Sequence, residues 1–278
     1  MSSFVPADPD YMARTRAVNL ISLLVLTVLT ASSVVPQVRP SPQEKGITFK
    51  ISVALEFKGR VVSGPLRQSD IPGLLDLPVR NGNRDLKEGS GVEMTRPDGK
   101  KFMVYTCREW KKAQAEQAYS ATTYDMAMEG FLIRTCGLLF ELQRAKLPLK
   151  SFVANPRVGL ASLNLLPAEI LSAITEDEAQ EKERLRGMTV SEVVASKDVE
   201  KAGDEVVTLS YGGFRQSFWE GVRADFNGDG IEDILVFTGG RAEGGTMGYA
   251  DYFVLTRTGP SEPLKLIQTK EPRQKTNQ

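Results

Sequence analysis

The sequence contains no histidine. Without histidine, neither a Ser-His-Asp triad nor a Cys-His pair can be built, which excludes the commonest nucleophilic enzymes. Zinc sites that use histidine are excluded for the same reason. A bound metal must therefore be held by oxygen ligands or by the two cysteines. Carboxylates, carbonyls and water are the ligands that calcium and magnesium prefer.

The chain also lacks net charge, because its 35 Lys and Arg residues equal its 35 Asp and Glu residues. No overall positive field is present to attract nucleic acid, so we do not expect a nucleic-acid-binding protein. Of its 278 residues, 41% are apolar and 25% are charged. These values are typical of a globular protein with one large domain or two small ones.

The N-terminal part contains an uncharged apolar run, Ala17 to Val35, preceded by Arg14 and Arg16. A positive flank, an apolar run and small residues such as Ala31 at its end are typical of a secretory signal. The run is also close to the ~20 residues that span a bilayer. Residues 1–35 are therefore predicted to be a signal peptide or a signal anchor. Either implies an extracytoplasmic location, periplasmic or secreted, with membrane contact only through residues 17–35 if they are not cleaved.

The remaining chain is predicted to be an α+β protein. Residues 36–46 form a proline-rich linker, residues 47–203 a mixed region, residues 204–270 an antiparallel meander and residues 271–278 a polar tail. In the mixed region, Ile47 to Phe57 alternates like a strand, and Leu66 to Gly91 is irregular. A strand is expected at Lys101 to Thr106, helical structure at Arg108 to Lys146 and Pro167 to Arg186, and a short helix capped by Thr189 and Glu192.

The C-terminal region is predicted to contain short strands separated by glycine-rich turns. They are Glu205 to Leu209, Gln216 to Ala224, Ile234 to Phe237, Tyr249 to Thr256 and Leu264 to Gln268.

Cys107 and Cys136 are the only cysteines. In one straight helix their Cα atoms would be roughly 43 Å apart, whereas a disulfide needs a separation within about 7 Å. A disulfide therefore requires a helical hairpin that turns near Ser120 to Thr123. Two buried free thiols are the alternative.

The segment Asp225-Phe226-Asn227-Gly228-Asp229-Gly230-Ile231-Glu232-Asp233 carries alternating oxygen side chains. Gly230 permits a sharp turn, and Ile231 offers a backbone carbonyl. Calcium accepts six to eight oxygen ligands in flexible geometry, whereas magnesium requires a stricter octahedron. The pattern therefore predicts a calcium site. It is not an EF-hand, because the twelfth position is Val236 instead of glutamate.

This segment resembles the nine-residue Asp-x-Asn-x-Asp-Gly-x-x-Asp loop of integrin α-subunit FG-GAP repeats. The resemblance covers about 25 residues, roughly Phe218 to Gly240, and implies a calcium loop between two antiparallel strands. It implies ligands at Asp225, Asn227, Asp229 and Asp233 and at the Ile231 carbonyl. The chain contains a single loop of this kind, so a full β-propeller is not expected.

Three functions follow from these observations. The first is an exported, non-enzymatic calcium-binding protein whose metal rigidifies the C-terminal β unit. The second is an envelope inhibitor or immunity-type protein that binds a protein partner through the loop Gly239 to Gly248 and an aromatic cluster. That cluster consists of Phe214, Phe218, Trp219, Tyr249, Tyr252 and Phe253. The third is a hydrolase that uses paired carboxylates, for which Glu129, Glu141, Glu220 and Asp251 are isolated candidates.

Overall fold

An antiparallel sheet of six strands organises the C-terminal part of the chain, in the order β12-β11-β10-β9-β8-β7. Each strand pairs with its neighbour in the sequence, so the sheet is the predicted meander. The strands are β7 (Val199–Ala202), β8 (Val206–Tyr211), β9 (Phe214–Ala224), β10 (Asp233–Ala242), β11 (Gly248–Thr256) and β12 (Lys265–Leu266).

The computed structural model describes residues 46–80, 91–153, 163–173, 175, 177–202 and 205–267. The predicted signal or anchor at residues 1–35, the linker up to residue 45 and the tail at 271–278 lie outside this part. The described residues all belong to one compact unit, Glu44–Gln278. Within the described ranges, no helix has the length and apolar character that crossing a membrane requires.

The strand β10 is buried on both faces along its apolar run, Ile234 to Phe237. Leu235 and Phe237 pack into one hydrophobic core, whereas Ile234 and Val236 pack into a second core. Successive side chains of a strand point to opposite faces of the sheet. The two cores therefore lie on the two faces of the meander.

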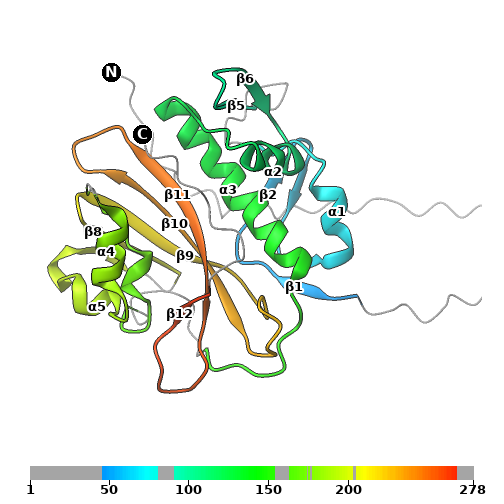
Figure 1. The fold of residues 1–278 in the computed structure, drawn as a ribbon. Coiled ribbons are helices and arrows are strands. Elements are labelled where there is room, and N and C mark those ends of the chain that lie inside the picture. The colour runs from blue at the N-terminus through cyan, green and yellow to red at the C-terminus, as the bar shows by residue number, and fades with distance from the viewer. Residues whose placement is uncertain are drawn as a thin grey trace, which may run out of the picture. The chain divides into compact units, whose positions relative to one another are not determined.

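The first core is covered by a helical hairpin, α2 (Cys107–Ala115) and α3 (Thr123–Arg144). The predicted helical segment Arg108 to Lys146 is thus two helices with a turn at the predicted place. Figure 1 shows α3 running beside the strands β9 to β11. The second core is covered by short elements, namely η4 (Ala168–Ile170), α4 (Glu178–Leu185) and α5 (Val190–Val193). The 3-10 turn η5 (Ser196–Asp198) leads from α5 into β7.

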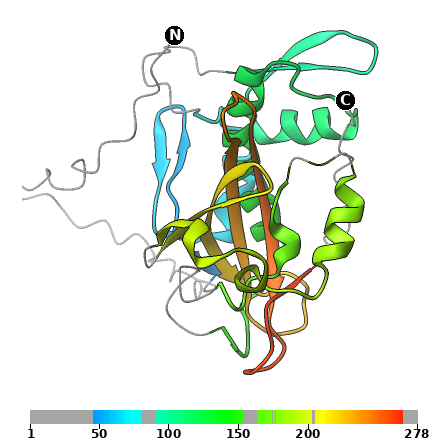
Figure 2. The ribbon, with the colours of Figure 1, turned by 90° about the vertical axis from the view of Figure 1, so that its left-hand side faces the viewer.

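Three two-stranded ladders and a short helix complete the first core. The ladders are β1 (Thr48–Lys50) with β4 (Pro65–Arg67), β2 (Leu55–Phe57) with β3 (Arg60–Val62), and β5 (Val92–Thr95) with β6 (Lys101–Val104). The 3-10 turn η2 (Gln68–Asp70) leads into α1 (Ile71–Leu74). Figure 2 shows blue N-terminal strands along one side of the long yellow-to-orange strands of the meander.

The prediction of a single strand from Ile47 to Phe57 is wrong, because the chain bends between β1 and β2. At the bend, the Ser52 N–H donates to the carbonyl of Gly221 in β9 at 2.8 Å. A tertiary contact therefore overrides the local alternation. The segment predicted to be irregular, Leu66 to Gly91, contains β4, η2 and α1, while its residues 81–90 lie outside the described part.

The prediction of one helix from Pro167 to Arg186 is also wrong. Only η4 forms after Pro167, and α4 begins at Glu178. Between them, the backbone of Ser172 makes two hydrogen bonds with the buried side chain of Gln216, an N–H to Oε1 contact of 3.0 Å and an Nε2 to carbonyl contact of 2.6 Å. These bonds hold Ser172 extended against the sheet. The predicted capping box is present, since the Glu192 carboxylate accepts the Thr189 N–H.

Gly137 allows α3 to approach β11 closely. A Cβ at this position would lie 2.2 Å from the Tyr252 ring, while one at Gly73 in α1 would have no heavy atom within 4 Å. We expect Gly137→Ala to lower the free energy of unfolding by about 1–3 kcal/mol, the usual cost of overpacking. Gly73→Ala should leave stability unchanged or raise it slightly, because alanine favours a helix. Denaturant titration of both variants measures the difference, and equal stabilities would contradict the close packing.

A surface network joins α4 to β8 and makes stability depend on pH. Arg184 donates two hydrogen bonds of 2.8 Å to the Glu181 carboxylate, and the Tyr211 hydroxyl donates a third. The bonds from Arg184, and then the one from Tyr211, lower the pKa of Glu181 to about 2. Glu181 therefore contributes stability above its ordinary pKa near 4.5, and this contribution is lost as pH falls toward 2.

We expect Glu181→Gln to lower stability at pH 7 by at most about 1 kcal/mol, because the network is largely exposed. Below the folded pKa the variant and the natural protein should be equally stable. Glu183→Gln is the matched control, because Glu183 lies on the same helix and pairs with the exposed Arg186 at 2.7 Å. Thermal melts from pH 7 down to acid follow the difference, and a deficit in Glu181→Gln that persists at low pH would contradict this account.

Candidate metal centre

The predicted calcium loop is the tip of the hairpin between β9 and β10. The ladder that precedes it ends with Asp233 paired to Ala224, so Asp225 begins the turn and Asp233 starts the returning strand. Gly228 and Gly230 have φ angles of 84° and 83°. Only glycine adopts such angles readily, so the two glycines allow the sharp turn that the sequence predicted at Gly230.

The oxygen side chains of the loop point inward, toward the backbone amides of the same loop. Asp225 accepts from Gly228 N at 2.6 Å and from Gly230 N at 3.0 Å. Asn227 Oδ1 accepts from Asp229 N at 2.9 Å, and Asp229 Oδ1 accepts from Ile231 N at 2.7 Å. The predicted ligands thus share one turn, and each of these oxygens is held by the turn itself.

Asp233 is the most constrained acid of the loop. Its side chain is fully buried, and its Oδ2 accepts the Phe226 N–H at 2.9 Å. Its Oδ1 has no hydrogen-bond partner. The nearby Thr256 hydroxyl partly offsets the effect of burial, which raises the pKa of the Asp233 carboxyl. The two groups do not have the geometry of a hydrogen bond, so the Thr256 hydroxyl oxygen is also unpartnered.

Burial is the largest effect on the pKa of Asp233 and raises it, and the negative charges of Asp229 and Asp225 raise it further. A buried carboxylate oxygen without a partner is costly. A cation beside Asp233 would contact the unpartnered oxygen and would offset the repulsion from Asp229 and Asp225. The donor set of the loop, three carboxylates, one amide and a backbone carbonyl, suits a hard cation such as calcium.

The loop has the residue types that a metal requires, but their side chains are not gathered around a common point. No group of three or more acidic or cysteine side chains in the described ranges is gathered closely enough to hold a metal ion. Asp225 and Asp229 are instead turned to the loop amides. Binding would therefore require these side chains to exchange amide contacts for metal contacts.

A segment that the sequence did not identify braces the loop. Directly after α3, Lys146 and Asp225 exchange two backbone hydrogen bonds of 2.8 and 3.0 Å, and Leu149 N donates to the Gly230 carbonyl at 2.8 Å. Glu232 N donates to the Lys150 carbonyl at 2.8 Å. No local sequence pattern predicts this pairing.

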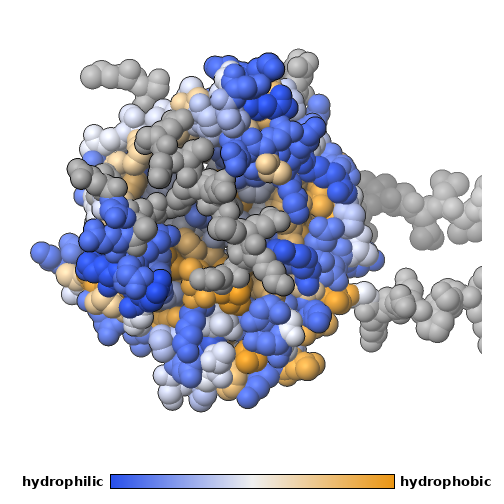
Figure 3. Space-filling model, viewed as in Figure 1, coloured by the Kyte–Doolittle hydropathy of each residue, from blue (hydrophilic) through white to orange (hydrophobic). Residues whose placement is uncertain are grey.

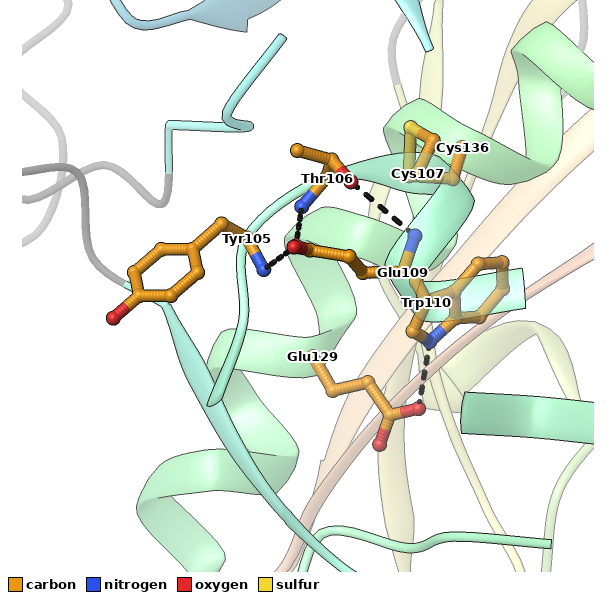
Figure 4. The surroundings of a disulfide bond; sticks show 7 residues. All are labelled: Tyr105, Thr106, Cys107, Glu109, Trp110, Glu129 and Cys136. Carbon is orange, nitrogen blue, oxygen red and sulfur yellow. Dashed lines mark hydrogen bonds between the residues drawn. A yellow bond between two sulfur atoms is a disulfide. The ribbon is translucent and has the colours of Figure 1, made fainter. Parts of the chain in front are cut away.

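The cysteines form a disulfide that joins the two helices of the hairpin. Cys107 at the start of α2 and Cys136 in α3 have a Cα–Cα distance of 5.1 Å. Figure 4 shows the bridge beside the capping box of α2, in which Glu109 accepts the N–H groups of Tyr105 and Thr106 at 2.8 and 3.0 Å. On the same helix, Trp110 Nε1 donates to Glu129 in α3 at 3.0 Å.

The isolated carboxylates considered for hydrolysis have structural partners. Glu129 also accepts from Gln114 and Ser120, which ties the helical hairpin together. Glu141 accepts from Arg144 and Tyr252, and Glu220 accepts two hydrogen bonds of 2.9 Å from Arg223. Asp251 accepts the N–H of the next residue in β11.

The aromatic cluster considered for partner binding lies largely in the core. Phe218 and Phe253 belong to the second core, while Trp219 and Tyr252 belong to the first. Phe214 is buried and packs edge-on against Tyr249. These side chains alternate between the two faces of the sheet, so they do not form one contact surface. The predicted loop Gly239 to Gly248 is also shorter, because β10 continues to Ala242.

Comparisons with protein-family models, with curated proteins and with solved structures found no match to this chain. The resemblance to FG-GAP loops therefore rests on the residues of the loop and its flanking strands alone.

Proposed function

We propose that this chain is an exported calcium-binding protein of structural or binding type, in which calcium rigidifies the β9–β10 hairpin. The observation that carries the proposal is Asp233, which is buried, has an unpartnered oxygen and is repelled by two further loop carboxylates. The side chains of Asp225, Asn227, Asp229 and Asp233 and the Ile231 carbonyl would hold the ion.

Calcium would supply the positive charge that the loop lacks. Without it, Asp225 and Asp229 raise the pKa of the buried Asp233 by repulsion. Because the loop is braced by the segment after α3, a bound ion would stabilise the hairpin and that segment together. A ligand that binds only the folded state raises stability by mass action, so a site of modest affinity is sufficient where calcium is plentiful.

The proposed export rests on the apolar run at residues 17–35 and on the disulfide. Disulfides persist in oxidising compartments outside the cytoplasm, and the bridge between Cys107 and Cys136 is compatible with such a compartment.

Calorimetric titration of the purified protein with calcium tests the proposal. We expect one saturable binding event in the natural protein and its loss in Asp229→Ala. The matched control is Asp98→Ala, because Asp98 also occupies an exposed turn beside a glycine of positive φ and accepts a backbone N–H at 3.0 Å. That variant should bind calcium like the natural protein. No heat of binding at millimolar calcium, or equal loss in both variants, would refute a specific site in this loop.

A further inference from the structure

We propose that residues 146–150, Lys-Leu-Pro-Leu-Lys, form a docking tip for an anionic phospholipid surface. The tip lies directly beside the calcium loop, and the calcium dependence of docking rests on the function proposed above. The tip itself is a separate feature, because its apolar and basic side chains are present whether or not the loop binds a metal.

The apolar part of the tip is exposed. Leu149 is 93% exposed and Leu147 is 53% exposed, and they flank Pro148. In Figure 1 the green segment after α3 passes beneath the tip of the β9–β10 hairpin at the lower edge of the molecule. The same edge carries apolar surface in Figure 3, where much of the rest is hydrophilic. Transfer of these exposed leucine side chains from water into an apolar phase would be favourable.

The backbone of the tip is fixed, although its side chains are exposed. Lys146 N donates to the Asp225 carbonyl at 2.8 Å, and Leu149 N donates to the Gly230 carbonyl at 2.8 Å. The Lys150 carbonyl accepts from Glu232 N at 2.8 Å. The two leucines are therefore presented by a rigid turn, which reduces the entropy that must be lost on binding.

The charges of the tip favour an anionic surface. Lys146 and Lys150 are exposed at its two ends, and the Lys150 ammonium lies 4.0 Å from the centre of the Phe152 ring. Lysines placed beside inserted apolar residues can reach lipid phosphates while their stems stay in the apolar layer.

The carboxylates of the neighbouring loop act against this attraction. Glu232 is partly neutralised, since Arg223 lies 3.8 Å from it and Ser151 donates to it at 2.7 Å. A bound calcium ion, with its two positive charges, would offset most of the negative charge of Asp225, Asp229 and Asp233. Docking should therefore be stronger when calcium is bound.

A lipid surface fits this tip better than a protein partner does. A stable protein interface needs about 800 Å² on each partner, which is more than two leucines and a proline supply. Two leucines between lysines on a narrow turn suffice for shallow insertion at a membrane surface.

Vesicle flotation tests the proposal, with the full protein and with vesicles of one part phosphatidylglycerol to three parts phosphatidylcholine. We expect calcium-stimulated binding to these vesicles and little binding to pure phosphatidylcholine. Leu149→Ser should weaken binding at least about tenfold, from the lost apolar transfer. The control is Met247→Ser, because Met247 is 46% exposed at the other end of β10, in the turn to β11. That variant should bind like the natural protein.

The outcomes separate the two proposals. If calorimetry detects calcium binding but the protein does not bind vesicles, the docking tip is refuted and the proposed calcium site is supported. Binding that is equal with and without calcium, and that Leu149→Ser removes, supports the tip and refutes its coupling to calcium. Equal binding by Leu149→Ser and the natural protein refutes the tip. Self-association that Leu149→Ser abolishes, without vesicle binding, also refutes it and indicates a protein contact.

Discussion

Replacing Asp233 with asparagine should reverse the order of stability of the natural protein and the variant when calcium is added. Without calcium, Asp233→Asn should melt at the higher temperature. With calcium in excess, the natural protein should melt at the higher temperature. Thermal unfolding in chelator and in calcium buffer measures both differences.

The order without calcium follows from the surroundings of Asp233. Burial and the nearby Asp229 and Asp225 disfavour its charged form, as the raised pKa shows. An asparagine removes that charge, while its amide oxygen can still accept the Phe226 N–H that now binds Oδ2 at 2.9 Å. Its amide nitrogen would replace the oxygen that has no partner. Stability should therefore rise in the variant.

The order with calcium follows from mass action. A calcium concentration of a hundred times the dissociation constant stabilises the folded natural protein by about 2.7 kcal/mol. The variant loses one carboxylate ligand and gains little. Asp98→Asn, in an exposed turn outside the loop, should change stability equally with and without calcium. If Asp233→Asn is less stable in both buffers, Asp233 is a structural acid and the loop is an ordinary turn.

Removing the disulfide should have the second large effect. The bridge closes a loop with a sequence separation of 29 residues. A covalent loop of this size restricts the unfolded chain and thereby stabilises the folded state by roughly 3–4 kcal/mol. The double variant Cys107→Ala, Cys136→Ala should therefore melt about 10 °C lower, on the usual relation between stability and melting temperature for a chain of this size.

Reductant provides the control for this prediction. It should lower the melting temperature of the natural protein to that of the double variant and leave the double variant unchanged. Two thiols that react in the folded natural protein without reductant would contradict the bridge.

The meander could be predicted because its signals are local, whereas the sequence predicts a helical hairpin only if Cys107 and Cys136 form a disulfide. Glycine-rich turns separate β8 from β9, β9 from β10 and β10 from β11, and the burial of β10 on both faces follows from its apolar run, Ile234 to Phe237. The α+β class, with mixed helices and an antiparallel C-terminal sheet, is confirmed. The disulfide geometry required a turn between the helices, and the structure has one between α2 and α3.

The remaining features depend on contacts between distant residues. The bend that divides Ile47 to Phe57 into two strands depends on the hydrogen bond between Ser52 and Gly221. The helix after Pro167 stops at η4 because Ser172 is hydrogen-bonded to Gln216. The strand β7 begins at Val199, ahead of the predicted boundary at residue 204, because pairing with β8 orders a sequence with little alternation of its own. Likewise, the spacing of the loop residues indicates the proposed ligands, but no local pattern indicates the brace from Lys146 to Lys150.

The most direct test of the calcium loop is a calcium titration followed by the backbone amide signals of Gly228, Gly230 and Ile231 in NMR spectra. These amides donate to Asp225 and Asp229, so they must change when the carboxylates turn to a metal. We predict that the three signals shift together and saturate with one dissociation constant, while the signal of Gly99 stays in place. Unchanged loop amides at millimolar calcium, or gradual shifts of equal size across the chain, would contradict a calcium site at Asp225–Asp233.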